Sequence, residues 1–233
     1  AVAMRPASHA QYFACTLESL APVADAYPDQ KSYLTSRRNE ADYLVITPPE
    51  LRAAAEALAE YRSDRSLKTM VVDLEDIMDE FNDGIQSPWA IHSFLSFTHR
   101  FWDQPPAYVA LLGSGTYDYK GYQTHGDNLL PVVMAGTPHG LFASDNRLAD
   151  IEGFDGLPDL AIGRIPAVTE EEALNYLDKM AAYEASLGAE WRSRMLLLAD
   201  KPVPGADFGQ DSDALTYVLP EGVAVEKIYR PGL

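Results

Sequence analysis

The chain has 233 residues, 47% of them hydrophobic, which is enough for one large α/β domain or a compact domain with a small appendage. Lys and Arg total 18 against 35 Asp and Glu, and the resulting formal charge of −17 repels a phosphate backbone, so we expect no nucleic-acid partner. No apolar run reaches the ~18 residues that a membrane helix needs, so no membrane span is expected either.

Residues 1–40 are rich in Pro, Ala and Ser and show only short alternating patches. They predict an extended arm, or the tail of a preceding domain. The single cysteine, Cys15, lies in this stretch and excludes an internal disulfide. Because no glycine-rich turn or histidine stands beside it, we predict a buried small apolar residue rather than a nucleophile.

From residue 41 onward, short apolar runs alternate with segments that have helical spacing of apolar residues. Apolar runs of this kind are typical of buried parallel strands, and strands that alternate with helices form a mostly parallel sheet with helices on both faces. The fold class is therefore α/β. The predicted strands are Tyr43–Ile46, Thr69–Asp73, Tyr108–Leu112, Leu160–Gly163, Met195–Ala199 and Val223–Ile228.

Three predicted helices carry start signals. Thr47 and Glu50 are expected to cap a helix that Pro48 and Pro49 open, with Leu51, Ala55 and Leu58 on its inner face. Ser87-Pro88 precedes a second helix, which carries Ile91, Phe94, Leu95 and Phe101. Thr169 and Glu172 form a capping box for a third helix, with Leu174, Leu177 and Met180 facing inward.

The loop between Ser114 and Asp159 is long for a compact domain and follows the carboxyl end of a predicted strand, where α/β sheets bind ligands. It holds a run of acids interleaved with Gly153 and Gly156, which predicts either a calcium site or a solvated acidic turn. We expect no organic cofactor, because Gly113-Ser114-Gly115 lacks the third glycine of a dinucleotide loop. The candidate calcium ligands are Asp145, Asp150, Glu152, Asp155 and Asp159.

The histidines form no complete catalytic set with other residues. His125 and His139, each followed by glycine, are interpreted as loop residues, since neither follows an apolar strand. His92 and His99 are seven apart on a predicted helix, too far from each other for joint metal ligation. No Ser–His–Asp set, zinc motif or phosphate loop is present in the sequence.

Several ordered motifs resemble peptidase family C25, which includes the gingipains and the sortase of the type IX secretion system. The resemblance runs from about residue 10 to the end of the chain. It rests on Ala41-Asp-Tyr-Leu-Val-Ile-Thr-Pro48, Ala110-Leu-Leu-Gly-Ser-Gly-Thr-Tyr-Asp-Tyr-Lys120, Ser144-Asp-Asn-Arg-Leu-Ala-Asp150 and Leu157-Pro-Asp-Leu-Ala-Ile-Gly-Arg-Ile-Pro166.

The resemblance implies a caspase-like catalytic region made of two α/β halves. Residues 1–40 then correspond to the tail of a preceding β domain, and residues 41–233 to the first half, which stops before the histidine of a Gly-His-Gly motif and the nucleophilic cysteine. We therefore expect the chain alone to be inactive. The implied partners are a peptide or protein substrate and a second catalytic subdomain, and the implied location is outside the cell or at its surface.

The resemblance also implies roles for three aspartates. Asp200 takes the place of the acid that orients the catalytic histidine. Asp211 or Asp213 takes the place of the aspartate that binds a basic P1 residue. The alternatives are a strand-end acid for Asp200 and helix N-terminal acids for the other two. Where many relatives have Gly-Asp-Gly, this chain has Ser114, which implies altered metal binding or a different specificity.

Two other functions are left open. The run Gly115-Thr-Tyr-Asp-Tyr-Lys120 resembles the sortase-like branch of the same family, which cleaves sorting signals and attaches proteins to the cell surface. A domain without catalytic activity, kept as a calcium-stabilised binding or scaffold module, is the second alternative.

Overall fold

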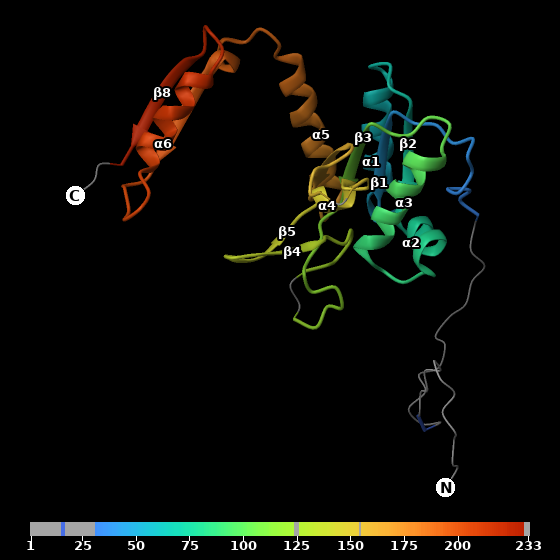
Figure 1. The fold of residues 1–233 in the computed structure, drawn as a ribbon. Coiled ribbons are helices and arrows are strands. Elements are labelled where there is room, and N and C mark those ends of the chain that lie inside the picture. The colour runs from blue at the N-terminus through green and yellow to red at the C-terminus, as the bar shows by residue number, and fades with distance from the viewer. Residues whose placement is uncertain (1–14, 17–30, 124–125, 154, 231–233) are drawn as a thin grey trace. The chain divides into compact units, whose positions relative to one another are not determined.

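The computed structural model describes residues 15–16, 31–123, 126–153 and 155–230, and Figure 1 labels its main helices and strands. By their contacts, residues 1–33 form one unit and residues 34–233 another. The second unit contains all of the elements described below. None of the helices in the described ranges is both long and apolar enough to cross a membrane.

A four-stranded parallel sheet, with strand order β2-β1-β3-β6, is the centre of this unit. Its strands are β1 (Tyr43–Thr47), β2 (Thr69–Asp73), β3 (Tyr108–Leu112) and β6 (Ala161–Ile165). The helices that connect or flank them are α1 (Arg52–Ser63), α2 (Leu74–Asn82), α3 (Pro88–Phe101) and α5 (Glu170–Ala185), and a short 3-10 helix, η2 (Pro49–Leu51), precedes α1. The predicted parallel sheet with helices on both faces is confirmed.

Each face of the sheet carries its own core, because successive side chains of a strand point to opposite faces. Leu44 and Ile46 of β1 pack with α2 and α3, where Phe94 is fully buried. Val45 points the other way and packs with α1 and α5 around Leu58. Burial on both faces explains why these strands appear in the sequence as continuous apolar runs.

The last two predicted strands lie outside this sheet. β7 (Arg194–Ala199) and β8 (Ala224–Tyr229) pair in parallel with each other and form a separate two-stranded sheet. The elements η3 (Glu190–Ser193), α6 (Phe208–Leu215) and η4 (Thr216–Val218) belong to the same part of the chain. The strands themselves were predicted correctly, but placing them in one sheet with the others was wrong.

The predicted helix starts had mixed outcomes. Ser87 accepts a hydrogen bond from the N–H of Trp89, and Thr169 accepts one from the N–H of Glu172, so both caps are confirmed. The Thr47 cap was wrong, because Thr47 ends the buried strand β1 and its hydroxyl donates to the carbonyl of Pro48 instead. Leu174 is exposed rather than on the inner face of α5.

The long loop after β3 holds small elements of its own. These are the antiparallel hairpin of β4 (Met134–Thr137) and β5 (Gly140–Ala143), followed by the one-turn helix α4 (Asn146–Ala149). Gly115 lets the start of the loop approach Leu130, since a Cβ at position 115 would lie 2.3 Å from the carbonyl oxygen of Leu130.

The N-terminal segment is anchored before residue 40, the predicted end of the arm. Leu34 is buried, its N–H donates to a carboxylate oxygen of Glu80 at 3.1 Å, and its carbonyl accepts from the indole of Trp102 at 3.0 Å. Residues 34–40 therefore pack on α2 and the end of α3. Cys15 is exposed, so its predicted burial was wrong.

Candidate active site

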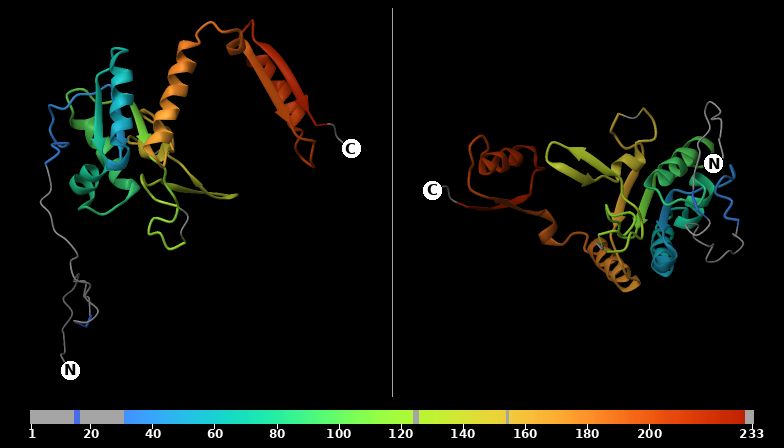
Figure 2. Two further views of the ribbon diagram at one scale, coloured as in Figure 1. Left: turned by 180° about the vertical axis from the view of Figure 1, so that it is seen from behind. Right: turned by 90° about the horizontal axis from the view of Figure 1, so that it is seen from below.

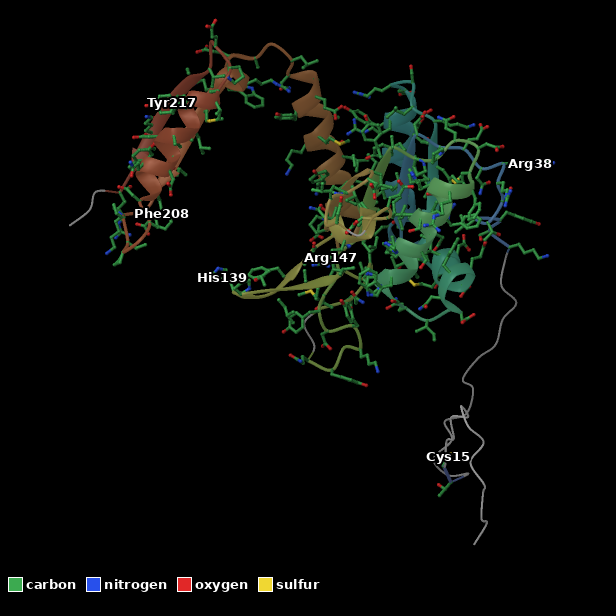
Figure 3. All side chains as sticks on the ribbon, viewed as in Figure 1. Cys15, Arg38, His139, Arg147, Phe208 and Tyr217 are labelled. Atoms are coloured by element: carbon green, nitrogen blue, oxygen red, sulfur yellow. The ribbon has the colours of Figure 1, made fainter. Side chains whose placement is uncertain are left out.

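The carboxyl end of β7 places two of the three predicted aspartates around one open hollow. Asp200 follows β7 directly, and Asp211 lies in the first turn of α6, whose N-cap is Asp207. The hollow has a volume of about 530 Å³, and Phe208, one of its wall residues, is labelled in Figure 3. It is lined by Leu198, Ala199, Asp200, Phe208, Asp211, Ser212 and Leu215.

Asp200 is exposed and only lightly engaged. Its side chain is 63% exposed, and one carboxylate oxygen accepts the N–H of Lys201 at 2.7 Å. The same oxygen lies 3.5 Å from the guanidinium of Arg230, and Arg230 is fixed to the end of β7 by a hydrogen bond from its N–H to the carbonyl of Ala199. Exposed ion pairs separated by this distance interact weakly. The carboxylate is therefore available to accept a further hydrogen bond.

Asp213 points to β8 and is not among the residues that line this hollow. One of its carboxylate oxygens accepts from the ammonium of Lys227 at 2.8 Å and from the hydroxyl of Tyr229 at 2.7 Å. These hydrogen bonds, that of Lys227 first, lower the pKa of the Asp213 carboxyl. Desolvation of the hydroxyl and its bond to Asp213 raise the pKa of Tyr229 to about 12. These bonds connect Asp213 of α6 to β8 and hold the helix against the strand.

A second hollow, of about 500 Å³, opens between the ends of the two strands. It shares Leu198, Ala199 and Asp200 with the first hollow and adds Ile228, Tyr229 and Arg230. Asp200 is thus the acid that both hollows have in common. Sequence reasoning missed Lys227 and Arg230, although the alternation along β8 indicates that Lys227 and Tyr229 share one face.

The five candidate calcium ligands do not converge. Asp145 binds the guanidinium of Arg164 through both oxygens, and Glu152 lies 3.3 Å from the imidazole of His99. Asp155 accepts the N–H of Leu157, and one oxygen of Asp159 accepts the N–H groups of Ile151 and Glu152. In the described ranges, no group of three or more His, Cys, Asp or Glu side chains is arranged to hold a metal.

Asp150 differs from the other four acids. It is 8% exposed, one oxygen accepts the N–H of Gly156 at 3.0 Å, and the other oxygen is buried without a hydrogen-bond partner. His92 contacts the backbone carbonyl of Asp150 at 3.1 Å. His92 and His99 therefore share the face of α3 on which the acidic loop rests, which their spacing of seven residues allows.

Arg164 is a residue whose role the sequence did not reveal. From β6, its guanidinium donates to Asp145 and to the carbonyls of Gly113 and Leu130, all at 2.8–2.9 Å. It thereby fastens the long loop to the end of the sheet. The signal in the sequence was a basic residue inside an otherwise apolar strand, Ala161–Ile165.

A protein-family model, described as peptidase family C25, matches residues 36–232. No curated protein sequence matches the chain. Among solved structures, the chain is similar to the Arg-specific cysteine proteinase gingipain R (RgpB), with 21% identity, a TM-score of 0.62, and coverage of 89% of this chain and 44% of that one.

Two other solved structures are similar. The complex of the pro- and mature domains of RgpB from Porphyromonas gingivalis has 20% identity and a TM-score of 0.61, over 82% of this chain and 42% of that one. Dimeric latent PorU from the same organism has 20% identity and a TM-score of 0.54, over 76% of this chain and 20% of that one. The chain thus spans less than half the length of each. These likenesses support the α/β fold.

Proposed function

The chain belongs to peptidase family C25, a family of cysteine peptidases, and from this premise we propose that it forms the first part of the catalytic region of a cysteine endopeptidase. The complete enzyme hydrolyses a peptide bond through a thioester on a cysteine. The observation that carries the proposal is the pair of carboxylates, Asp200 and Asp211, on one open hollow at the end of β7.

In this proposal the nucleophile and its histidine base come from sequence beyond residue 233. The only cysteine, Cys15, lies outside the residues that the family model matches. The β7–β8 sheet also supports a second subdomain, because Leu196, Leu198 and Ile228 are all exposed on it. A parallel sheet is normally covered on both faces. The chain alone is therefore inactive, and a following subdomain packs on these side chains.

Asp200 is proposed to orient the histidine. A carboxylate that accepts the Nδ1–H of the imidazole leaves Nε2 free to take the thiol proton, and it stabilises the imidazolium that results. Asp200 suits this role because its carboxylate is exposed and lies at the strand end. Its Arg230 neighbour moves aside at small cost, since the pair is exposed and long.

Asp211 is proposed to bind the basic P1 side chain of the substrate. The hollow combines its carboxylate with the apolar walls that Phe208 and Leu215 of α6 provide. A Lys or Arg side chain matches this combination, since its aliphatic stem contacts apolar surface and its charged end pairs with an acid. The substrate class is then peptides and proteins with a basic residue before the cleaved bond.

The test is a polypeptide that continues past Leu233 in its reading frame, assayed on peptides with Arg, Lys or Glu at P1. Asp200→Asn is expected to lower kcat by 100-fold or more, as on the order of 10⁴ is lost when a triad acid is neutralised. Asp211→Asn is expected to raise KM for basic peptides only. Asp178→Asn is the control, since Asp178 lies on α5 and lines neither hollow. Equal loss in all three variants contradicts the proposal.

Calcium remains a proposal, and the acidic loop fits it only in part. Asp150 offers one buried oxygen without a partner, whereas the other four acids are bonded elsewhere. If calcium binds, EDTA lowers the thermal midpoint and added calcium raises it. A thermal midpoint that changes with neither EDTA nor calcium rules out calcium binding, and with it the calcium-stabilised module as an alternative function.

We also propose a location outside the cell or at its surface, supported by the family resemblance alone and tested by cell fractionation.

A further inference from the structure

The β4–β5 hairpin has no charged residue, although the chain around it is strongly acidic. Residues 128–144 contain no Asp, Glu, Lys or Arg, whereas the whole chain has a net charge of −17. All four residues of β5 are exposed, with Leu141 at 67% and Phe142 at 53%. Exposed sheet edges usually carry charges that prevent pairing with other chains. This hairpin lacks that protection.

The register identifies which backbone groups of the hairpin are free. The N–H of Ser144 donates to the carbonyl of Val133 at 2.8 Å, and hydrogen-bonded pairs alternate along an antiparallel ladder. Phe142 therefore bonds to β4, while the N–H and C=O groups of Leu141 and Ala143 point away from it. Within the described residues, these groups have no backbone partner on another element.

The outer edge of β4 is less accessible than that of β5. The hydroxyl of Tyr119 contacts the backbone of Met134 and donates to the carbonyl of Val132. This contact occupies the start of the β4 edge. Figure 2 shows the two strands as a ribbon of their own, and Figure 3 labels His139 at its tip. The free edge is therefore that of β5.

We propose that the outer edge of β5 binds an extended polypeptide strand with an uncharged centre and basic flanks, which adds to the hairpin as a third strand. Leu141 and Ala143 exchange backbone hydrogen bonds with it, and the side chains of Leu141 and Phe142 contact its alternate residues. That this strand is a segment of the peptidase's own substrate rests on the proposed function.

An extended basic strand fits this edge better than other occupants. A helix leaves the edge N–H and C=O groups unpaired, because its own backbone bonds are internal. A second copy of the chain brings a charge of −17 against −17. A basic strand is attracted by the same charge, and its uncharged centre matches the uncharged edge. It also converts a two-stranded hairpin, which is marginally stable by itself, into a three-stranded sheet.

The test measures fluorescence anisotropy of a labelled peptide, Lys-Lys-Thr-Val-Thr-Val-Lys-Lys, on the 233-residue chain. Leu141→Pro removes one outward N–H without breaking the β4 ladder, so affinity is expected to fall about tenfold or more. Leu141→Ala keeps the N–H and is expected to retain binding within about threefold. Circular dichroism and thermal melts of both variants establish that they are folded.

A second measurement holds even if the proline variant fails to fold. The same peptide, N-methylated at alternate residues, loses the donors that a third strand needs and is expected not to bind. Equal binding of the parent and N-methylated peptides overturns the proposal, as does equal binding by folded Leu141→Pro. Dimers that form with concentration and disappear in Leu141→Pro, without peptide binding, assign the edge to a second copy instead. These binding assays measure no catalysis, so a failed peptidase assay does not change their result.

Discussion

Arg164 connects the sheet to the loop that follows β3. Its side chain is 11% exposed and donates to Asp145 and to the carbonyls of Gly113 and Leu130. Removing one partner of a buried ion pair leaves the other charge uncompensated. Arg164→Ala is therefore expected to lower the free energy of unfolding by about 3 kcal/mol.

Chemical denaturation of Arg164→Ala and of a control, Arg52→Ala, checks this expectation. Arg52 is half exposed, pairs with Glu56 at 3.0 Å and lies 3.7 Å from Asp73, so it is expected to contribute less than about 1 kcal/mol. Arg164→Lys keeps the charge but lacks the planar fork, so an intermediate loss is expected. If Arg164→Ala is no worse than Arg52→Ala, the loop does not depend on this guanidinium.

Tyr229 and Asp213 make the β8–α6 contact sensitive to pH. The pKa of Tyr229 rises from 10.0 to about 12, so its contribution is present below pH 10 and is lost as the pH rises through 12. The pKa of Asp213 is lowered from 3.8, so its contribution is present above pH 3.8 and is lost as the pH falls through the lowered value. NMR titration of the tyrosine rings tests this expectation, and Asp213→Asn is expected to bring the pKa of Tyr229 back toward 10.

Among the candidate site residues, Asp200 was named because the family resemblance implies an acid directly after this strand. The structure places it at the carboxyl end of β7, and its role stays a prediction. Asp211 and Asp213 were both kept as candidates. They lie two residues apart on a short helix, so their side chains point in different directions, and the sequence does not say which direction faces a pocket. Lys227 and Tyr229 separate them, and contacts between residues 14 and 16 positions apart are not visible in a local pattern.

The β7–β8 pair is an element with two different faces. Leu197 is 8% exposed on the face that packs toward α6, whereas Leu198 is 65% exposed on the other face. Leu197→Ala is expected to cost about 2–3 kcal/mol, and Leu198→Ala less than about 0.5 kcal/mol in the chain alone. In a polypeptide that continues past Leu233, the loss at Leu198 is expected to rise toward that at Leu197.

Hydrogen exchange of the β7 and β8 amides measures both losses locally. Leu174→Ala on α5 is the control, because Leu174 is exposed and lies on another element. If the cost of Leu198→Ala is the same in the short and the longer polypeptide, nothing covers this face, and the proposed second subdomain does not pack there.

Elements with strong periodicity were predicted from the sequence, and irregular ones were not. β1 and β3 are continuous apolar runs buried on both faces, and α3 begins at a clear Ser87-Pro88 signal. The β4–β5 hairpin was missed because Gly136, Pro138 and Gly140 interrupt its alternation. The separate pairing of β7 and β8 was missed because local pattern does not say which strands become neighbours.

For the molecule as a whole, the net charge of −17 bears on the class of partner, and the four-stranded sheet and the β7–β8 sheet bear on stability and on the site. The charge favours basic peptides over nucleic acid as partners, and a preference for basic peptides agrees with both proposed peptide contacts. The four-stranded sheet has cores on both faces, whereas the β7–β8 sheet leaves the face with Leu196, Leu198 and Ile228 exposed. We therefore expect the four-stranded sheet to contribute most of the stability, and the proposed catalysis to require a subdomain that covers the β7–β8 sheet.

The most direct test is peptide hydrolysis by a polypeptide that continues past Leu233, compared with the 233-residue chain, before and after alkylation of thiols with iodoacetamide. We expect no hydrolysis by the 233-residue chain. We expect the longer polypeptide to hydrolyse peptides after basic residues, and alkylation of a cysteine beyond Leu233 to abolish this activity. Hydrolysis by the short chain, or activity of the longer one that survives full alkylation, would contradict these expectations.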